Sequence, residues 1–204
     1  MAQSYGINQS PINAPDGHPT DMSFDSKAFS AFFKHIEARS ATRILDIGPV
    51  CGDNINLLAQ LVHQLYICDM FTRLGQWLKN DHSSGHVWQY LDYAPDTFDG
   101  ILLWDLADRM SDNLISGAGK KCWHILKPGG IVMACASGEK ENHAGVRAFV
   151  LANDLSISFR NQAHLDLPLY TRKTREIIDT MAPLKLVQSS LFRNGLREFI
   201  FKKN

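Results

Sequence analysis

Residues 43–54, Arg-Ile-Leu-Asp-Ile-Gly-Pro-Val-Cys-Gly-Asp-Asn, place the tightest limit on how this chain can fold. A short apolar run ends at Asp46, glycines follow at Gly48 and Gly52, and Asp53 comes directly after them. That order predicts a strand, a glycine loop and the start of a helix, with which an α/β sheet brings its backbone close to a small ligand. A bare helix N-terminus favours a phosphate, whereas these two carboxylates repel one. We therefore expect the loop to face a ligand that carries a cationic group.

Further apolar runs that end in acids follow this loop along the chain. Asp69 ends the run Leu-Tyr-Ile-Cys-Asp and lies about twenty residues beyond the loop, where nucleotide-binding sheets place a ribose-binding acid. Asp92 follows Tyr-Leu, and Asp105 ends the run Phe-Asp-Gly-Ile-Leu-Leu-Trp-Asp. Residues 125–132, Ile-Leu-Lys-Pro-Gly-Gly-Ile-Val, combine a helix end, a turn and a strand. Strands separated by helical segments predict parallel βαβ units, whose helices cover both faces of one sheet.

In order and spacing, these five segments resemble the class I S-adenosylmethionine-dependent methyltransferases over about residues 43–136. The Asp-x-Gly-x-x-x-Gly stretch is similar to motif I of that family, which has a further glycine where this chain has Val50. The hairpin sequence at 193–198, Arg-Asn-Gly-Leu-Arg-Glu, resembles a small bacterial subgroup of the family. The resemblance implies an α/β fold, a three-layer Rossmann-like sandwich with a mostly parallel seven-stranded sheet and a C-terminal antiparallel hairpin. Asn194-Gly195 between two apolar runs independently predicts that hairpin.

The resemblance implies S-adenosylmethionine as methyl donor and S-adenosylhomocysteine as product. The glycine backbone would approach the amino-acid end of the donor, Asp46 its ammonium, Asp69 the ribose hydroxyls and Asp92 the adenine amino group. Asp46 has a plainer role as the cap of the following helix, and Asp69 has one as a surface carboxylate at a strand end. Asp96 and Asp99 lie near Asp92 and are alternatives to it. A tryptophan at a strand end is commonly a core residue. The predicted cofactor-binding residues are Asp46, Gly48, Pro49, Gly52, Asn54, Asp69, Met70, Asp92, Tyr93 and Trp104.

Catalysis of methyl transfer requires a base only when the acceptor atom carries a proton that must leave. The candidates that follow the fourth and fifth expected strands are Trp104, Asp105, Asp108, Ser137 and Glu139, and we predict Asp105 as the catalytic residue. The Asn/Asp-Pro-Pro-aromatic motif of DNA amino-methyltransferases and the Pro-Cys nucleophile of cytosine-C5 methyltransferases are both missing from the sequence. We therefore expect a small-molecule acceptor.

Length and composition limit the other partners. The 204 residues fit a flexible N-terminal leader at 1–22 and a single methyltransferase-like domain at 23–204. The formal net charge is zero, so no overall field recruits nucleic acid, although the basic excess after Tyr170 suits either an anionic substrate or a solvated face. No apolar stretch has the length of a membrane span. The four cysteines have no Cys-x-x-Cys spacing, which predicts free thiols, a cytoplasmic location and no metal site, and leaves the oligomeric state open.

Hydrophobic periodicity supplies the remaining elements. Inward-facing side chains in the helix after the glycine loop are expected at Ile55, Leu58, Leu61 and Val62. Residues 155–170 are expected to form an insertion. Helices are predicted at 26–38, 53–63, 71–80, 111–126, 140–153 and 172–181, and strands at 43–47, 65–69, 86–91, 98–104, 130–136, 184–191 and 196–202.

Two other functions fit parts of the pattern. A non-catalytic S-adenosylmethionine-binding module of the same fold would explain the incomplete glycine loop and the lack of an obvious base. A nicotinamide-dependent oxidoreductase requires Gly-x-Gly-x-x-Gly, which the loop does not supply, and must accommodate Asp53 at the helix start.

Overall fold

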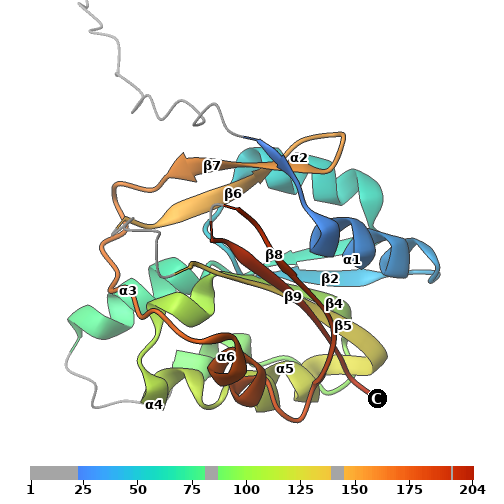
Figure 1. Ribbon diagram of the computed structural model, residues 1–204. Coiled ribbons are helices and arrows are strands. Elements are labelled where there is room, and N and C mark those ends of the chain that lie inside the picture. Colours follow the sequence, from blue (N-terminus) through green and yellow to red (C-terminus); the bar gives the residue numbers. More distant parts are fainter. Residues whose placement is uncertain (1–22, 81–86, 139–144, 194) are drawn as a thin grey trace, which may run out of the picture.

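The computed structural model describes residues 23–80, 87–138, 145–193 and 195–204. Within these residues the main sheet has six strands in the order β3-β2-β4-β5-β9-β8 (Figure 1). β2, β3, β4 and β5 are parallel, β9 is antiparallel to β5, and β8 is antiparallel to β9. The α/β class, the mostly parallel sheet and the C-terminal hairpin are confirmed. The strands are β2 (Arg43–Asp46), β3 (Gln64–Ile67), β4 (Phe98–Trp104), β5 (Leu126–Ala136), β8 (Lys185–Leu191) and β9 (Arg197–Lys202).

The expected strand at 86–91, which would have been the seventh, is wrong. Val87–Leu91 form a 3-10 helix, η1, and Trp88 Nε1 donates a hydrogen bond to the carbonyl of Leu114 at 2.7 Å. The adjacent residues Val87 and Trp88 are both buried in the same core. This does not fit a strand, in which successive side chains point to opposite faces. In the described chain, β3 is therefore the terminal strand of the sheet.

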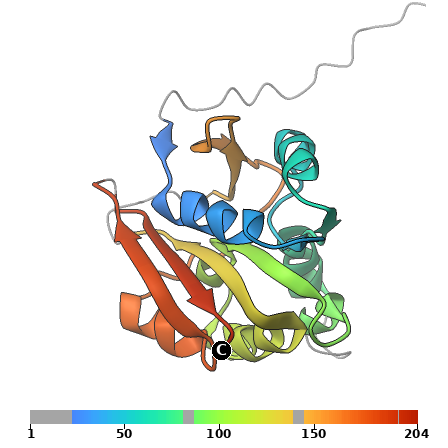
Figure 2. The same ribbon diagram turned by 90° about the vertical axis from the view of Figure 1, so that its right-hand side faces the viewer.

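Helices cover both faces of the sheet, so the expected three layers are present (Figures 1 and 2). Strand β5 shows how the layers divide, because Ile131, Met133 and Cys135 enter one core while Val132 and Ala134 enter the other. The first core contains α1 (Lys27–Glu37) and α2 (Gly52–Leu61). The second contains side chains of α3 (Met70–Lys79), α4 (Asp112–Ile115), α5 (Ala118–Ile125) and α6 (Thr174–Thr180).

Helix α1 begins at two side chains that accept hydrogen bonds from its first amides. Ser26 Oγ accepts from the amide of Phe29 at 2.9 Å, and Glu198 Oε2 accepts from the amide of Ala28 at 3.1 Å. Ser26 also donates its hydroxyl proton to the buried Glu198. Burial raises the pKa of Glu198, against the hydrogen bonds that lower it. The last residue of the Arg-Asn-Gly-Leu-Arg-Glu stretch therefore fastens α1 to strand β9.

A second, three-stranded antiparallel sheet lies on the α1 and α2 side, in the order β1-β7-β6 (Figure 1). Its strands are β1 (Phe24–Asp25), β6 (Arg147–Leu151) and β7 (Ser156–Asn161). The helix expected at 140–153 is wrong where the structure describes it, because Arg-Ala-Phe-Val-Leu forms β6. Phe149 and Leu151 of this strand are buried in the core that contains α1 and α2. A short apolar run cannot be assigned to helix or strand by periodicity alone. The insertion expected at 155–170 contains β7.

Two helices differ from their expected form. In α2 the buried residues are Asn54, Leu57 and Leu58, whereas Leu61 is exposed. The inward face is rotated because Asn54, a polar residue, is bonded into the core. The single helix expected at 111–126 is divided into α4 and α5 at Gly117, where a Cβ atom would lie only 2.9 Å from the indole of Trp88.

The leader expected at residues 1–22 lies outside the described residues, and so does Asn194 of the β8–β9 turn. Gly195 of that turn has φ of +92°, which L side chains rarely adopt. The described part of the chain contains no helix with the length and apolar character to cross a membrane. Cys51, Cys68, Cys122 and Cys135 are all free thiols.

Candidate functional site

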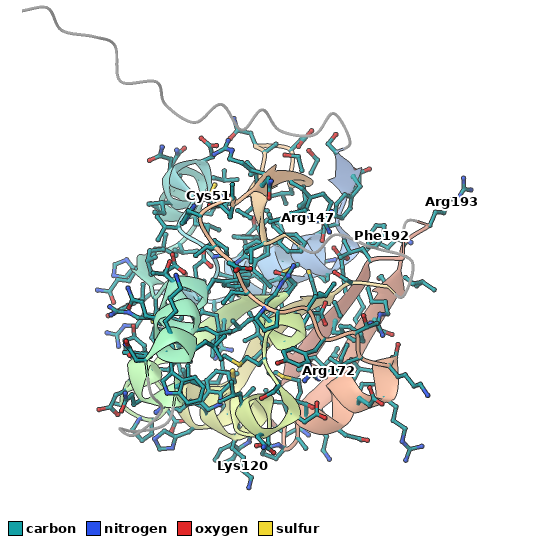
Figure 3. All side chains as sticks on the ribbon, turned by 90° about the vertical axis from the view of Figure 1, so that its left-hand side faces the viewer. Cys51, Lys120, Arg147, Arg172, Phe192 and Arg193 are labelled. Atoms are coloured by element: carbon teal, nitrogen blue, oxygen red, sulfur yellow. The ribbon has the colours of Figure 1, made fainter. Side chains whose placement is uncertain are left out.

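Asp46, Asp69 and Trp104 lie at the carboxyl ends of the parallel strands β2, β3 and β4, which form the carboxyl edge of the sheet. Figure 3 shows the side chains of the molecule from the left-hand side of Figure 1. Strands β2 and β4 are neighbours, and the chain runs from β2 to β3 on one side and to β4 and β5 on the other. Open α/β sheets bind ligands at such a switch point. Asp46 ends β2 and Trp104 ends β4. In Figure 3, Cys51 of the glycine loop and Arg147 of β6 lie in the upper part of the molecule, and Arg172 lies below them.

Asp46 lies at the centre of this edge and is 5% exposed. Its Oδ1 accepts hydrogen bonds from the amide of Gly48 at 2.9 Å and from Trp104 Nε1 at 2.7 Å. The pKa of Asp46 is raised to about 6. Burial is the main cause and the charge of Asp69 adds to it, whereas the two hydrogen bonds lower the pKa. Near neutral pH the edge therefore holds a buried negative charge, and none of the described lysine, arginine or histidine side chains forms an ion pair with it.

Trp104 belongs to the core and covers Gly48. It is 2% exposed and stacks on Phe149 and Phe29, with ring centroids 5.3 and 6.2 Å away. A Cβ atom at position 48 would lie 2.4 Å from the indole Cδ1, so the glycine makes room for this side chain. The side of Gly48 on which a Cβ atom would lie is thus filled by Trp104.

The rest of the glycine loop is more open. Val50 is 55% exposed, so its side chain points away from the fold at the position where the family has glycine. A Cβ atom at Gly52 would meet nothing within 4 Å, whereas Pro49 is buried. The side chain of Asn54 points to β6 and is not part of the ligand-binding edge. Its Nδ2 donates to the carbonyl of Phe149 at 2.7 Å, and its Oδ1 accepts from the amide of Leu151 at 2.9 Å. It fastens β6 to α2.

Arg160 of β7 reaches the start of α2. Its guanidinium forms an ion pair with Asp53 at 2.6 Å and lies 4.0 Å from Cys51 Sγ. In the sequence analysis, the charge of Asp53 made a phosphate at this helix unfavourable. In the structure, Arg160, more than one hundred positions away, partly balances that charge.

Asp69 caps α3 and also reaches back to the glycine loop. Its carboxylate accepts from the amide and the hydroxyl of Thr72 at 2.8 and 2.9 Å, and from the amide of Val50 at 3.3 Å. A carboxylate has about four acceptor positions, so about one stays open for a ligand. The role of Thr72 was not anticipated, although a threonine three residues after a capping aspartate is a recognisable local pattern.

A cavity of about 470 Å³ adjoins Asp69 at the end of β3. Tyr93, a predicted adenine neighbour, lines it, and Tyr90, which was not predicted, lines it too, with the Arg73 guanidinium 5.1 Å from its ring centroid. Asp92 is exposed and is not among the lining residues, and Met70 is fully buried in the core. The lining residues are Ile67, Cys68, Asp69, Thr72, Arg73, Gln76, Tyr90 and Tyr93.

A second group of charged residues lies beyond Trp104. Asp105 is 3% exposed, and its Oδ2 lies 3.5 Å from the guanidinium of Arg109. Asp108 is fully buried, and its Oδ2 accepts from the amide of Ser137 at 2.6 Å. Burial is the main cause that raises the pKa of Asp105, and it also raises the pKa of Asp108, to about 7. The predicted base and a second candidate thus lie side by side at the ends of β4 and β5.

Two of the basic residues near the C-terminus, Arg172 and Arg197, are structural anchors, whereas Lys173, Arg175, Lys185 and Arg193 are exposed. Arg172 donates to the carbonyls of Ala107 and Met110 and pairs with Asp112 at 2.8 Å. Arg197 donates to the carbonyls of Ser137 and Arg172 at 2.7 and 2.6 Å. These two guanidinium groups hold together the segments around the site.

A larger cavity of about 930 Å³ lies beside Arg172 and Tyr170, between the α4 segment and α6. Among the described residues, no group of histidine, cysteine or acidic side chains is arranged to hold a metal.

No family model matches the sequence, and no curated protein matches it significantly. Solved structures do match. An S-adenosylmethionine-dependent methyltransferase from Mesorhizobium loti has a TM-score of 0.56 at 10% identity, over 86% of this chain and 96% of that one. The N-methyltransferase NodS from Bradyrhizobium japonicum WM9 has a TM-score of 0.54 at 13% identity, over 86% and 93%.

A third match was crystallised with ligands. The 1,6-didemethyltoxoflavin-N1-methyltransferase from Burkholderia thailandensis, with bound 1,6-didemethyltoxoflavin and S-adenosylhomocysteine, has a TM-score of 0.51 at 13% identity, over 88% of this chain and 80% of that one. At such identities a structural match speaks for the architecture of the chain. The chain has the fold of the class I S-adenosylmethionine-dependent methyltransferases.

Proposed function

We propose that this protein binds S-adenosylmethionine at the carboxyl edge of its sheet and transfers the methyl group to a small-molecule acceptor. The observation that carries the proposal is the pair of carboxylates at this edge. Asp46 is buried at the switch point, and Asp69 adjoins a cavity of about 470 Å³ at the next strand end. Two carboxylates suit a ligand with a cationic amino-acid end and a ribose.

The described residues fit such a ligand in most of its parts. The carboxylate of Asp46, which is bonded to the amide of Gly48, attracts the ammonium of the ligand. The space beside Gly52 lets the ligand approach the backbone of the loop closely. The open acceptor position of Asp69 suits a ribose hydroxyl, and a ligand that displaces the amide of Val50 gains a second one. Tyr90 and Tyr93 offer aromatic surface to the adenine, with Asp92 and Met70 nearby in sequence.

When bound, S-adenosylmethionine supplies a methyl group on a cationic sulfur, which is already a good leaving group. The protein therefore accelerates the reaction mainly by alignment and by exclusion of water from the acceptor. Asp105 is the predicted base. It directly follows β4 and is buried beside Arg109. Free thiols favour the reducing cytoplasm as the location.

Equilibrium dialysis with radiolabelled S-adenosylmethionine tests the proposal. We expect micromolar binding by the wild-type protein, competition by S-adenosylhomocysteine and a loss of at least tenfold in affinity for Asp69→Ala. Asp179→Asn, an exposed carboxylate on α6, is the matched control and should bind normally. A folded wild-type protein that retains no label at millimolar ligand would refute the proposal.

A non-catalytic binding module remains the second candidate. Two observations favour it: Trp104 fills one side of Gly48, and Asp69 already accepts three hydrogen bonds. Stable binding of the donor with no methylated product across amines, alcohols, thiols and carboxylates would support this candidate. A nicotinamide-dependent oxidoreductase is the third candidate, and protection by NADH in a thermal melt would favour it.

A further inference from the structure

The end of β4 departs from regular strand geometry just before Asp105. The pairing of β4 with β5 shifts register between Leu102 and Trp104, and Trp104 has φ of +52°. A bulky residue with positive φ is uncommon and strained, and such strain concentrates at functional sites. The irregularity turns the chain into the 3-10 helix η2 (Leu106–Arg109) directly after Asp105. Side chains three residues apart are eclipsed in a 3-10 helix, which is the spacing of Asp105 and Asp108.

Each of these two carboxylates has one oxygen that is buried without a hydrogen-bond partner in the described part of the chain. Asp105 Oδ1 and Asp108 Oδ1 are both in this condition, while the second oxygen of each is used by Arg109 and by the amide of Ser137. Asp105 is 3% exposed and Asp108 is 0% exposed. A buried polar atom without a partner is costly, and a native structure rarely keeps one without a functional reason. The two oxygens therefore point to a missing hydrogen-bond donor.

The charged groups around Asp108 come from two parts of the chain, the η2 segment and β9. Asp105 and Arg109 flank it along η2, and Arg197 lies across from it on β9. The guanidinium of Arg197 is held by the carbonyls of Ser137 and Arg172, and that of Arg109 by Asp105 and the carbonyl of Gly145. Asp105 thus has a cationic partner at 3.5 Å, whereas the oxygen of Asp108 that is bonded is held by a neutral amide.

We propose that Asp108, in place of the sequence-predicted base Asp105, accepts the proton of an amine acceptor, and that Asp105 positions Asp108 electrostatically for this task. This inference rests on the proposed methyl transfer. In the step, the nitrogen lone pair forms the new N–C bond, and the S–C bond breaks with its electron pair going to sulfur. The N–H proton passes to Asp108 Oδ1, so that charge and atoms balance. The acceptor class is a primary or secondary amine.

The carboxylate pair favours an amine over other acceptors. Positive charge develops on an amine nitrogen as the new bond forms, and a nearby carboxylate stabilises that charge directly. Burial, with the charge of Asp105 as a further cause, raises the pKa of Asp108 to about 7, which suits proton transfer near neutral pH. An alcohol must lose a proton that a carboxylate of this strength removes poorly. A thiolate attacks without a base and gains nothing from two carboxylates beside it.

The test is methyl transfer from radiolabelled S-adenosylmethionine to a panel of primary and secondary amines, alcohols and thiols. We expect label in amines, and a value of kcat/KM that rises with pH up to about 7. Asp108→Asn should lower kcat by about a hundredfold or more and leave the donor affinity within twofold. Asp179→Asn should match the wild type in both respects.

Asp105→Asn separates positioning from a structural role. Removal of the neighbouring negative charge lowers the pKa of Asp108, so the rising limb of the pH profile should move to lower pH. Label found only in alcohols or thiols, no transfer to any amine while the donor binds, or an Asp108→Asn enzyme with wild-type kcat would each overturn the inference. The wild-type panel decides the acceptor class even if a variant does not fold. A wild-type protein that fails to bind the donor would instead refute the proposed function.

Discussion

Replacement of Asp46 by asparagine should stabilise the protein while weakening the binding of its proposed cofactor. The folded-state pKa of Asp46 is raised from 3.8 to about 6, chiefly by burial. Folding therefore favours the protonated form, and stability from this group is greatest below about pH 4 and is lost as the pH rises through about 6. At about 1.4 kcal/mol per pH unit, the charged carboxylate costs about 3 kcal/mol at pH 8.

Asparagine avoids this cost because it does not ionise. Its Oδ1 still accepts from the amide of Gly48 and from Trp104 Nε1, which lie 2.9 and 2.7 Å from the native oxygen. We expect the free energy of unfolding of Asp46→Asn to exceed that of the wild type by about 1 to 3 kcal/mol at pH 8, and to match it near pH 4. The affinity for S-adenosylmethionine should fall at least tenfold, because the ammonium loses its counter-charge.

Urea unfolding followed by circular dichroism measures the free energy of unfolding at pH 8 and at pH 4. Asp179→Asn, whose native carboxylate is exposed and 3.8 Å from Arg175, should change stability by less than about 0.5 kcal/mol at either pH. A variant at position 46 that is less stable than the wild type at pH 8, or that differs from it equally at both pH values, would refute the reasoning about the buried charge.

Substitutions at three other positions test the framework around the site. Asp69→Ala removes the cap on Thr72 and should lower the free energy of unfolding by about 1 kcal/mol, whereas Asp69→Asn should lose less, as chemical denaturation will measure. Asn54→Ala breaks two buried hydrogen bonds to β6, so a loss of about 1 to 3 kcal/mol is expected, together with faster amide hydrogen exchange in β6. Gly48→Ala forces a Cβ atom to within 2.4 Å of Trp104 and should cost about 1 to 3 kcal/mol, and an unchanged melting temperature would contradict the packing described.

The parallel strands and the hairpin were predictable because each carries a local signal. The run Arg-Ile-Leu-Asp ends at a glycine loop, and Asn194-Gly195 marks a hairpin turn. Residues 147–151 were assigned to a helix because an apolar run of this length fits either element, and only its pairing with β7 decides between them. The conformation of the η1 residues likewise depends on a distant contact, the hydrogen bond from Trp88 to the carbonyl of Leu114, 26 positions away.

The same limit applies to the site. The sequence identified the strand-end acids, since carboxyl ends of parallel strands meet at one edge. It did not reveal that the Asn54 amide is bonded to β6, that Asp53 pairs with Arg160, or that Trp104 covers Gly48. These contacts join residues that lie dozens of positions apart. The contacts of Asn54 and Asp53 also depend on the second sheet, for which the sequence carries only a weak local signal.

Calorimetric titration of S-adenosylhomocysteine into the wild-type protein tests the central claim most directly, because the product binds without turnover. A carboxyl edge that holds a sulfur nucleoside predicts one site per chain, micromolar affinity, and a clear loss of affinity in Asp69→Ala. A folded protein that releases no heat and retains no ligand at millimolar concentration would contradict the account.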